Sequence, residues 1–471
     1  MLLAPAPSIK QFGAPRTMNA TQAANYGILA IPVGCLAALA VLPASLSEPG
    51  ALMFSSWLLA IGLLTGMIAD VLLNGIHRIF RAEHIGMMAV IVVIFAEPLQ
   101  SFYVTDQATE VVQKTFIAVA VFGTAFALGS SLWPGKLPKS LIALASRSYS
   151  SLTMLKMALA CWTIAMVGYF AASGYSITVM IEGLGAGRWG SPWARGSLGD
   201  WTAFRDFLSY FGYPLPTFAV FIRLREKSWF DLKVVAALFC AATFLPFPAQ
   251  GGGRRVIVVI LGSALVTWLC AHRINLKVRH YAALAAISLL SVIGLEIMLA
   301  QRNEGLQTIT YKKDDFTGLH VDNNFDTLSS TLQIFPEDAD YLYHKYIWYT
   351  IVRPIPRILW EGKPVSGGFD LAAYRGWRGV SLANTIVGEL YMSFGWIAIV
   401  LGGILLGRLA STWSQLLDGN FATSGLALYG MGTMCLFIGI RSMLELVLMT
   451  YPIFCWWGLD AAVFSRAAVR K

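Results

Sequence analysis

Apolar runs alternate with short polar segments along most of the chain, from Tyr26 to Phe464. Most runs hold about 15 to 25 residues, close to the length that an α-helix needs to cross the roughly 30 Å hydrocarbon core of a bilayer. The pattern predicts an all-α polytopic membrane protein with about twelve transmembrane helices. The predicted helices begin near Tyr26, Phe54, Ile85, Thr115, Thr153, Phe207, Val234, Val256, Tyr281, Ala383, Phe421 and Leu444.

Composition supports this class of protein. Of 471 residues, 56% are hydrophobic and 13% are charged, and the mean hydropathy is +0.62. All six cysteines fall inside the apolar runs, where they behave as small hydrophobic residues, so neither a disulfide framework nor a Cys-rich metal site is indicated. The first 25 residues contain three prolines and no apolar core, and we expect a short tail there rather than a secretory signal.

The distribution of basic residues predicts the orientation. Eighteen Lys and Arg residues lie in the two tails and in one alternate set of short connections, so we expect those segments and both termini in the cytoplasm. Most of the net charge of +9 then faces anionic lipid headgroups, and no nucleic-acid partner is indicated. The predicted regions are a cytoplasmic tail (1–25), nine transmembrane helices (26–300), a large periplasmic loop (301–382), three further transmembrane helices (383–464) and a second cytoplasmic tail (465–471).

The stretch QGGGRR, residues 250–255, is an exception to this charge rule, because it places Arg254 and Arg255 on the predicted outer face. A helix that begins there presents N-terminal backbone N–H groups and the positive end of its dipole, and the glycines let the backbone approach a ligand closely. Since arginine forks match phosphate oxygens, the stretch indicates a diphosphate site. The other interpretation is a pair of arginines that reach to the membrane interface.

The predicted outer loop 301–382 has the composition of folded protein. Its 82 residues include nine Lys or Arg, ten Asp or Glu and thirteen aromatic residues. Aromatic faces among polar groups suit sugar binding and are equally common in protein cores. Within the loop, RPIPRILWEGKP (353–364) predicts a stiff, charged turn, because three prolines disfavour both helix and central strand.

Two charged residues near the C-terminal helices are further candidates. Glu389 lies about one turn inside a predicted helix with Asn384 as its N-cap, a position that suits either a general base or an ion pair with an arginine. Arg441 lies just outside the last predicted span and is followed at i+4 by Glu445. That spacing suits a structural ion pair as well as a substrate contact.

The stretch IPRILWEGKP, followed about twenty residues later by NTIVGELYMSFGWIAIVLGG, resembles the bacterial oligosaccharide repeat-unit polymerases, the O-antigen polymerase (Wzy) family. In that family an iPR-x-x-W-x-x-KP stretch precedes a helix with a GE-x-Y-x-x-FG pattern, and a polar Gly/Arg stretch similar to GGGRR precedes a span. The motif region covers about 55 residues, and the hydropathy pattern with its large late loop extends the similarity. The chain departs from the pattern at Glu361, where a proline is common after the tryptophan.

This resemblance implies a multi-pass, GT-C-like enzyme of the bacterial inner membrane. Such an enzyme moves a growing glycan from a polyprenyl-diphosphate carrier to an incoming carrier-linked repeat, without a cofactor, a metal ion or a nucleotide sugar. The implied partners are the carrier-linked oligosaccharide and the membrane, with a flippase and a chain-length regulator as further candidates. The expected catalytic residues are Glu389, Arg254 and Arg255, and the expected substrate-binding residues are Arg302, Arg357, Trp360, Lys363, Tyr391, Arg441 and His344.

Two other classes of function remain open. A carrier-dependent ligase or another polytopic glycosyltransferase would differ in its acceptor, which the sequence does not show. A non-enzymatic transporter would gather charged residues at mid-bilayer, whereas the candidates here cluster at the predicted outer surface.

Several weaker motifs are set aside or left open. GAGRWG (185–190) matches GxGxxG but has no βαβ unit around it. EDAD (337–340) contains a DxD pattern that is common by chance, so no metal site is expected. His320 and His344, in the predicted outer loop, suit either a general base or plain surface.

Overall fold

The structure is a computed structural model of the chain. It describes residues 18–132, 135–187, 189–194, 202–250, 253–273, 322–352, 368–376, 382–419 and 421–468, together with scattered residues within 277–298 and 355–362. For residues 18–24, 202–203 and 463–468 only the backbone is described.

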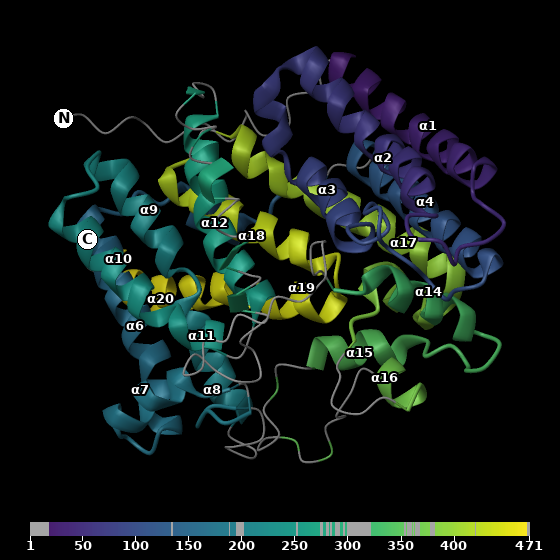
Figure 1. Cartoon of the computed structure of the whole chain (residues 1–471). Helices are drawn as coiled ribbons and strands as arrows, with labels where there is room; N and C mark the ends of the chain where they lie inside the picture. The colour runs from purple at the N-terminus through teal and green to yellow at the C-terminus, as the bar shows by residue number, and fades with distance from the viewer. Residues whose placement is uncertain are drawn as a thin grey trace.

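Helices make up the ordered elements, and no strand occurs among the described residues. The α-helices and the 3-10 helices η2 and η4 are α1 (Met18–Ala40), α2 (Met53–Asn74), η2 (Ile76–Phe80), α3 (Ala82–Ile94), α4 (Thr109–Leu132), α5 (Lys139–Ser146), α6 (Ser151–Ala172), α7 (Ile177–Gly185), α8 (Thr202–Ser209), η4 (Tyr210–Gly212), α9 (Leu215–Glu226), α10 (Leu232–Phe244), α11 (Pro246–Gln250), α12 (Arg254–His272), α14 (Asn324–Ile334), α15 (His344–Val352), α16 (Leu371–Tyr374), α17 (Thr385–Asp418), α18 (Thr423–Gly439), α19 (Met443–Met449) and α20 (Tyr451–Ala468). Figure 1 shows them gathered into one bundle.

Six helical segments in the described part of the chain are long and apolar enough to cross a membrane: α2, α4, α6, α10 with α11, α12 and α17. Apolar stretches of α1, α3 and α18 are shorter. The predicted sixth span is divided into α8, η4 and α9, and the predicted last span into α19 and α20. The chain is therefore a helical, multi-pass membrane protein, but two of the twelve predicted spans are divided. The predicted ninth span, which begins near Tyr281, lies largely outside the described residues.

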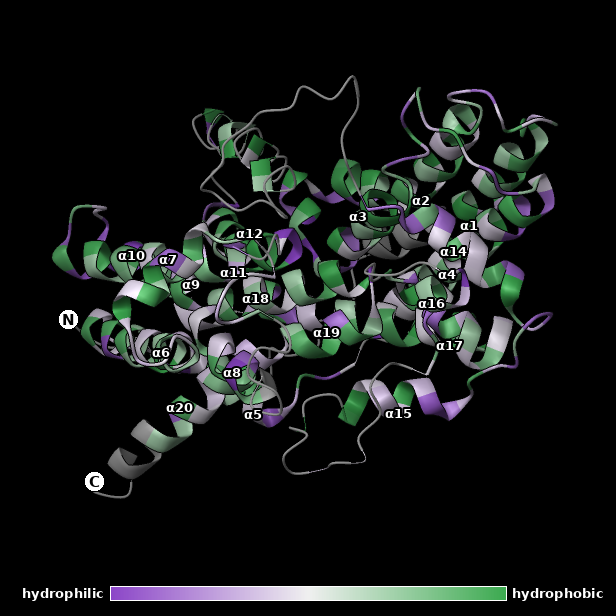
Figure 2. Ribbon diagram, turned by 60° about the horizontal axis from the view of Figure 1, so that its bottom comes forward, coloured by the Kyte–Doolittle hydropathy of each residue, from purple (hydrophilic) through white to green (hydrophobic). Residues whose placement is uncertain are grey.

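The outside of the bundle is apolar, as a bilayer requires. Figure 2 shows hydrophobic residues on many sides of the helices. Large apolar side chains that remain exposed include Leu29 on α1, Leu72 on α2 and Phe239 on α10. In water such surface would be unfavourable, whereas lipid chains cover it without cost. All six cysteines are buried and free, in agreement with their prediction as small hydrophobic residues.

Small residues bring α17 against α4. A Cβ atom added to Gly407 would lie 2.0 Å from the Phe126 carbonyl oxygen, and one added to Gly129 would lie 2.1 Å from the Ile404 carbonyl oxygen. Gly403 also faces α4, where an added Cβ would lie 2.8 Å from the Cβ of Ala125. The GxxxG sequence at 403–407 thus forms the packing surface of α17 against α4.

A kink divides α17 at Phe394 and Gly395. Gly395 has φ +63°, a conformation that favours glycine, and an added Cβ would lie 2.9 Å from the Tyr341 hydroxyl. Because the helical hydrogen-bond pattern is interrupted there, the Met392 carbonyl accepts a hydrogen bond from the Leu342 backbone N–H at 2.8 Å. The kink thereby fastens the segment before α15 to the first part of α17.

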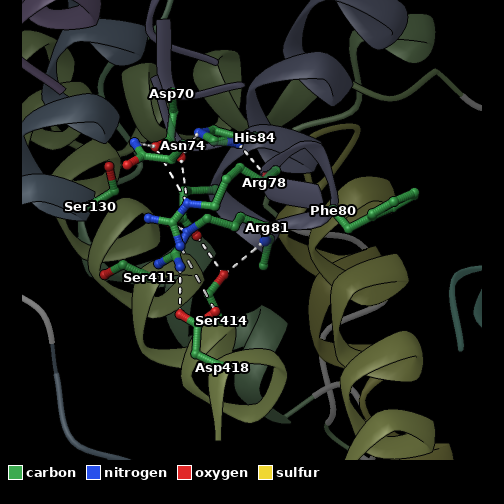
Figure 3. A network of polar contacts seen from close by, with 12 residues as sticks. Asp70, Asn74, Arg78, Phe80, Arg81, His84, Ser130, Ser411, Ser414 and Asp418 are labelled. Carbon is green, nitrogen blue, oxygen red and sulfur yellow. Dashed lines mark hydrogen bonds and ion pairs between the residues drawn. The ribbon is translucent and has the colours of Figure 1, made fainter. Parts of the chain in front are cut away.

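A polar network ties the far end of α17 to the α2–α3 connection (Figure 3). Arg81 donates to Glu83 and to Asp418, the last residue of α17, at 2.5 Å each. Glu83 in turn accepts from Ser414 at 2.5 Å. Asp70 of α2 extends the network by accepting from neighbouring side chains, including Asn74 at 2.7 Å. All these contacts join parts of the protein to one another, so we interpret this end as a structural anchor.

At the other end of α17 four elements begin close together. The Ile386 backbone N–H donates to the Ile440 carbonyl at 2.9 Å, which joins the start of α17 to the segment before α19. Ion pairs of Arg441 and Glu445 join the segment before α19 and the start of α19 to the starts of α12 and α14. Thr327 of α14 donates to the Ala383 carbonyl, just before α17, at 2.9 Å. Figure 1 shows α14 and α15 beside α19 and the first part of α17. We call this part of the bundle the Arg254 end and the part around Asp418 the Asp418 end.

Candidate functional site

Two arginines from distant parts of the sequence meet on one carboxylate. Arg254, the first residue of α12, donates from Nη2 to Asp322 Oδ1 at 3.0 Å. Arg441, just before α19, donates from Nε to Asp322 Oδ2 at 2.8 Å. Asp322 lies just ahead of α14, and its side chain is 42% exposed, against 21% for Arg254 and 14% for Arg441. The two guanidinium groups therefore converge on one point at the surface of the Arg254 end.

A second acidic residue completes the ion-pair network. Arg255 donates from Nη1 to Glu445 Oε1 at 2.6 Å, and Arg441 Nη1 lies 3.9 Å from the same oxygen. The i,i+4 pair of Arg441 and Glu445 is thus present as the spacing predicts, but the shorter contact of Arg441 is with Asp322. Adjacent arginines on α12 consequently have different acidic partners.

Glu389 lies beside this network and is 3% exposed. Its Oε1 accepts from the Ser442 hydroxyl at 2.6 Å, and its Oε2 accepts from the Met443 backbone N–H. Tyr346 of α15 interacts with the same carboxylate, and burial together with this negative charge raises the pKa of Tyr346 well above its ordinary value. Glu389 thus holds the turn that carries Arg441. An ion pair with an arginine, one of the two roles considered for Glu389, is not found among the described contacts, in which its partners are these neutral donors.

The predicted N-cap of α17 is confirmed by position only. Asn384 precedes the first helical residue, but its side chain makes no capping hydrogen bond. Its Oδ1 atom is buried without a partner, and Thr385, the next residue, has φ +55°. Left-handed backbone is strained for a β-branched residue, so this helix start is held in place by its surroundings.

The start of α14 places two more carboxyl groups near Asp322. Asn323, with its amide oriented to suit its neighbours, donates to Glu97 at 3.2 Å and to Asp326 at 2.9 Å. Burial, aided by the charges of Asp326 and Asp322, raises the pKa of Glu97 to about 7. Burial alone would also raise the pKa of Asp322, but Arg441 and Arg254 outweigh it and lower that pKa. Asp322 is therefore charged at neutral pH, whereas Glu97 titrates there.

The GxGxxG-like loop holds the QGGGRR stretch in place. Gln250 donates from Nε2 to the carbonyls of Ala186 and Gly187, at 2.6 and 3.1 Å, and accepts from the Trp193 indole at 3.1 Å. A Cβ added to Gly253 would lie 2.9 Å from the Pro248 carbonyl, so this position needs glycine for close approach. The GxGxxG-like loop thus supports the start of α12.

Other expected site residues lie elsewhere or outside the described residues. Tyr391 is 2% exposed and packs between Tyr341, at a ring distance of 5.9 Å, and the Lys114 ammonium, 5.2 Å from its ring centroid. His344 is exposed at the start of α15, and Trp360 is half-buried outside any helix. No contact in the described structure joins these three to the arginines. Arg302, Arg357 and Lys363 lie outside the described residues, as does His320.

Three residues of the site were not predicted from the sequence: Asp322, Tyr346 and Glu97. Asp322 and Tyr346 belong to the long segment whose acidic and aromatic residues are numerous, and nothing in their spacing separates them from the rest. Glu97 ends an apolar run, and a carboxyl group at the end of a predicted span on the same side as Arg254 was a usable signal.

The arrangement is suited to bind an anion with more than one negative charge. Arg254 stands at the N-terminus of a 19-residue helix with a glycine N-cap and no side-chain cap, so the positive end of the helix dipole adds to the arginine charges. No family model, no curated protein and no solved structure matches the chain. Its chemistry must therefore be argued from the residues themselves.

Proposed function

We propose that the protein is a polymerase of lipid-linked oligosaccharide repeat units. It transfers a growing glycan from a polyprenyl-diphosphate carrier to the sugar of an incoming carrier-linked repeat, at the outer face of a bacterial inner membrane. The observation that carries this proposal is the convergence of Arg254 and Arg441 on one point, at the helix start where Arg255 also lies. The motif resemblance of the region 355–403 supports the same class of reaction.

In this reaction a hydroxyl oxygen of the acceptor sugar attacks the anomeric carbon of the growing glycan. The bond from that carbon to the carrier diphosphate breaks, and the diphosphate leaves with the electron pair. Arg254 and Arg441 stabilise the negative charge that develops on it, a contribution that preorganised donors supply best in a site shielded from water. The acceptor hydroxyl gives its proton to a base.

Glu389 and Glu97 are the candidates for that base. Glu389 is the residue expected from the sequence, but its burial and its contacts with Ser442 and Met443 support a positioning role toward Arg441 instead. Glu97 is partly exposed, and its raised pKa of about 7 suits proton transfer near neutral pH. We therefore propose that Glu389 positions Arg441 and that Glu97 is the group to test as the base.

The proposal is tested with purified protein in detergent and a chemically defined polyprenyl-diphosphate-linked repeat. Formation of a ladder of longer glycans supports the polymerase, whereas transfer only to a different acceptor, such as a lipid A core, supports a ligase. Translocation of the intact carrier-linked repeat in vesicles, without a new glycosidic bond, would instead establish a transporter.

A further inference from the structure

Asp322 occupies the point at which the two arginines converge. Its two carboxylate oxygens are divided between them, Oδ1 to Arg254 and Oδ2 to Arg441. Two phosphate oxygens, or one oxygen from each group of a diphosphate, would use the same donors. A bound diphosphate and the Asp322 carboxylate thus require the same positions.

The carboxylate is a charged occupant, but one that can be displaced. Arg441 and Arg254 outweigh the effect of burial and hold the pKa of Asp322 below its ordinary value, so it stays an anion at neutral pH. Its side chain is nonetheless 42% exposed, which makes it the most exposed of the five charged side chains in the ion-pair network. The backbone is fixed separately, because the Asp322 carbonyl accepts from the Asn324 N–H at 2.7 Å. A side-chain rotation can therefore vacate the site without unfolding α14.

We propose that Asp322 is an internal competitor at the anion site: its carboxylate occupies the two donors in the absence of substrate and is displaced by the diphosphate of the carrier. This inference rests on the proposed function. An incoming anion must outcompete a carboxylate that is already bonded to both arginines. A diphosphate brings more negative charge and more acceptor oxygens than one carboxylate, whereas a monophosphate ester carries about −1.5 to −2 charge and a single phosphate group.

The same competition bears on the carrier that leaves. After transfer the carrier diphosphate remains on Arg254 and Arg441, and return of the Asp322 carboxylate to its two donors weakens that hold. Asp322 therefore competes at entry and assists at exit through one pair of contacts.

The test measures binding of three probes to the purified full-length protein: a polyprenyl diphosphate, the matching monophosphate and inorganic pyrophosphate. We expect Asp322→Asn to bind each probe about tenfold more tightly, because loss of the competing carboxylate raises every affinity by the same factor. Asp322→Glu, which retains the charge, should keep the wild-type affinities. Asp340→Asn, which removes an exposed carboxylate from the same long segment, is the matched control and should leave all three affinities unchanged.

The outcomes separate this inference from the proposed function. Unchanged affinities in Asp322→Asn overturn the inference, and so does weaker binding of every probe with a lower melting temperature, which assigns Asp322 a purely structural role. Arg254→Ala and Arg441→Ala measure the site itself. If both arginine variants bind the polyprenyl diphosphate as the wild type does, the proposed anion site is wrong. If only the Asp322 result fails, the site stands. Binding of the lipid probes without pyrophosphate competition places recognition in the lipid chain and also overturns the inference.

Discussion

Arg254 and Arg255 are neighbours in the sequence, but helical neighbours point about 100° apart. Arg254 reaches Asp322 and shares it with Arg441, whereas Arg255 reaches the buried Glu445. The charges alone do not distinguish the two residues, but their contacts do. Arg254 faces the exposed carboxylate that an incoming anion can replace, and Arg255 faces one that is enclosed.

We therefore predict different results at the two positions. Arg254→Ala should reduce polymer formation by about 10²- to 10³-fold, because a donor to the leaving diphosphate is lost. Arg254→Lys should also fail, since lysine keeps the charge but lacks the planar fork. Arg255→Lys should stay nearly normal, because an ammonium group can still pair with Glu445. The measurement is a glycan ladder from purified protein, compared with the abundance of each variant. Normal ladders from both Arg254 variants would show that Arg254 is only an interfacial anchor.

Glu389 gives a second prediction at this scale. In Glu389→Gln the side-chain amide must turn its NH₂ group toward either the Ser442 hydroxyl or the Met443 N–H, so one of these two buried donors loses its acceptor. An unmade buried hydrogen bond costs about 1–3 kcal/mol, so we expect a lower melting temperature together with loss of polymer formation. Loss of activity with an unchanged melting temperature would favour the general-base role instead. A fully active variant would exclude both roles.

The charge rule marked Arg254 and Arg255 as exceptional, and Arg441 and Glu389 stood at predicted helix ends on the same side, so their proximity was predictable. The position of Asp322 was not predictable, because the long loop contains many acidic residues. Sequence spacing does not show which of them folds back against the helix ends. Tyr391 was expected near substrate, but two residues along a helix from Glu389 it points to another face and is buried there.

At the scale of elements, the length of the apolar runs correctly predicted where helices occur. It was less successful in predicting that each run forms one unbroken helix. The helices α2, α4 and α6 are each continuous, as the unbroken apolar runs in their sequences predict. The predicted sixth and twelfth spans are divided instead, and their breaks lie at the Arg254 end, where Tyr210 of η4 contacts Tyr451 of α20 at a ring distance of 5.3 Å. Hydropathy cannot detect such breaks, because the residues on both sides are equally apolar.

The contact between α17 and α4 supports the third prediction. In Gly407→Ala the new methyl group would lie 2.0 Å from the Phe126 carbonyl oxygen, so the two helices must separate. Overpacking of this kind costs about 1–3 kcal/mol, and we expect a clearly lower melting temperature in detergent. Gly458→Ala on α20 is the matched control, because nothing lies within 4 Å of its added Cβ. Equal melting temperatures for the two variants would contradict the close contact.

At the scale of the whole molecule, the charged groups of the site indicate what stabilises the negative charge that develops in the proposed reaction. In the proposed site arginines at a helix start take the electrostatic role that a divalent ion plays in many other transferases. We therefore predict that purified protein still makes polymer from the lipid-linked repeat in excess EDTA. Recovery of activity only after addition of Mg²⁺ or Mn²⁺ would contradict this and direct attention to Asp338 and Asp340.

The two polar networks also define opposite ends of the molecule, because they lie at opposite ends of α17. Gly50 donates to the Tyr103 carbonyl, and the Tyr103 hydroxyl donates to Asp326, so the loop that contains Glu48 belongs to the Arg254 end. Lys227 follows α9, which starts near that end and runs away from it. The positive-inside rule then predicts that Glu48 is outside the cell membrane and Lys227 is in the cytoplasm.

Cysteine labelling tests this orientation directly, and the background is low because all six native cysteines are buried. A membrane-impermeant maleimide added to intact spheroplasts should modify the Glu48→Cys variant and spare the Lys227→Cys variant until the membrane is opened. Both positions are exposed, so a difference reports the side of the membrane rather than burial. The reverse pattern would place Arg254, Arg441 and Asp322 in the cytoplasm. The donor would then have to be bound before export, and polymerisation at the outer face would be impossible.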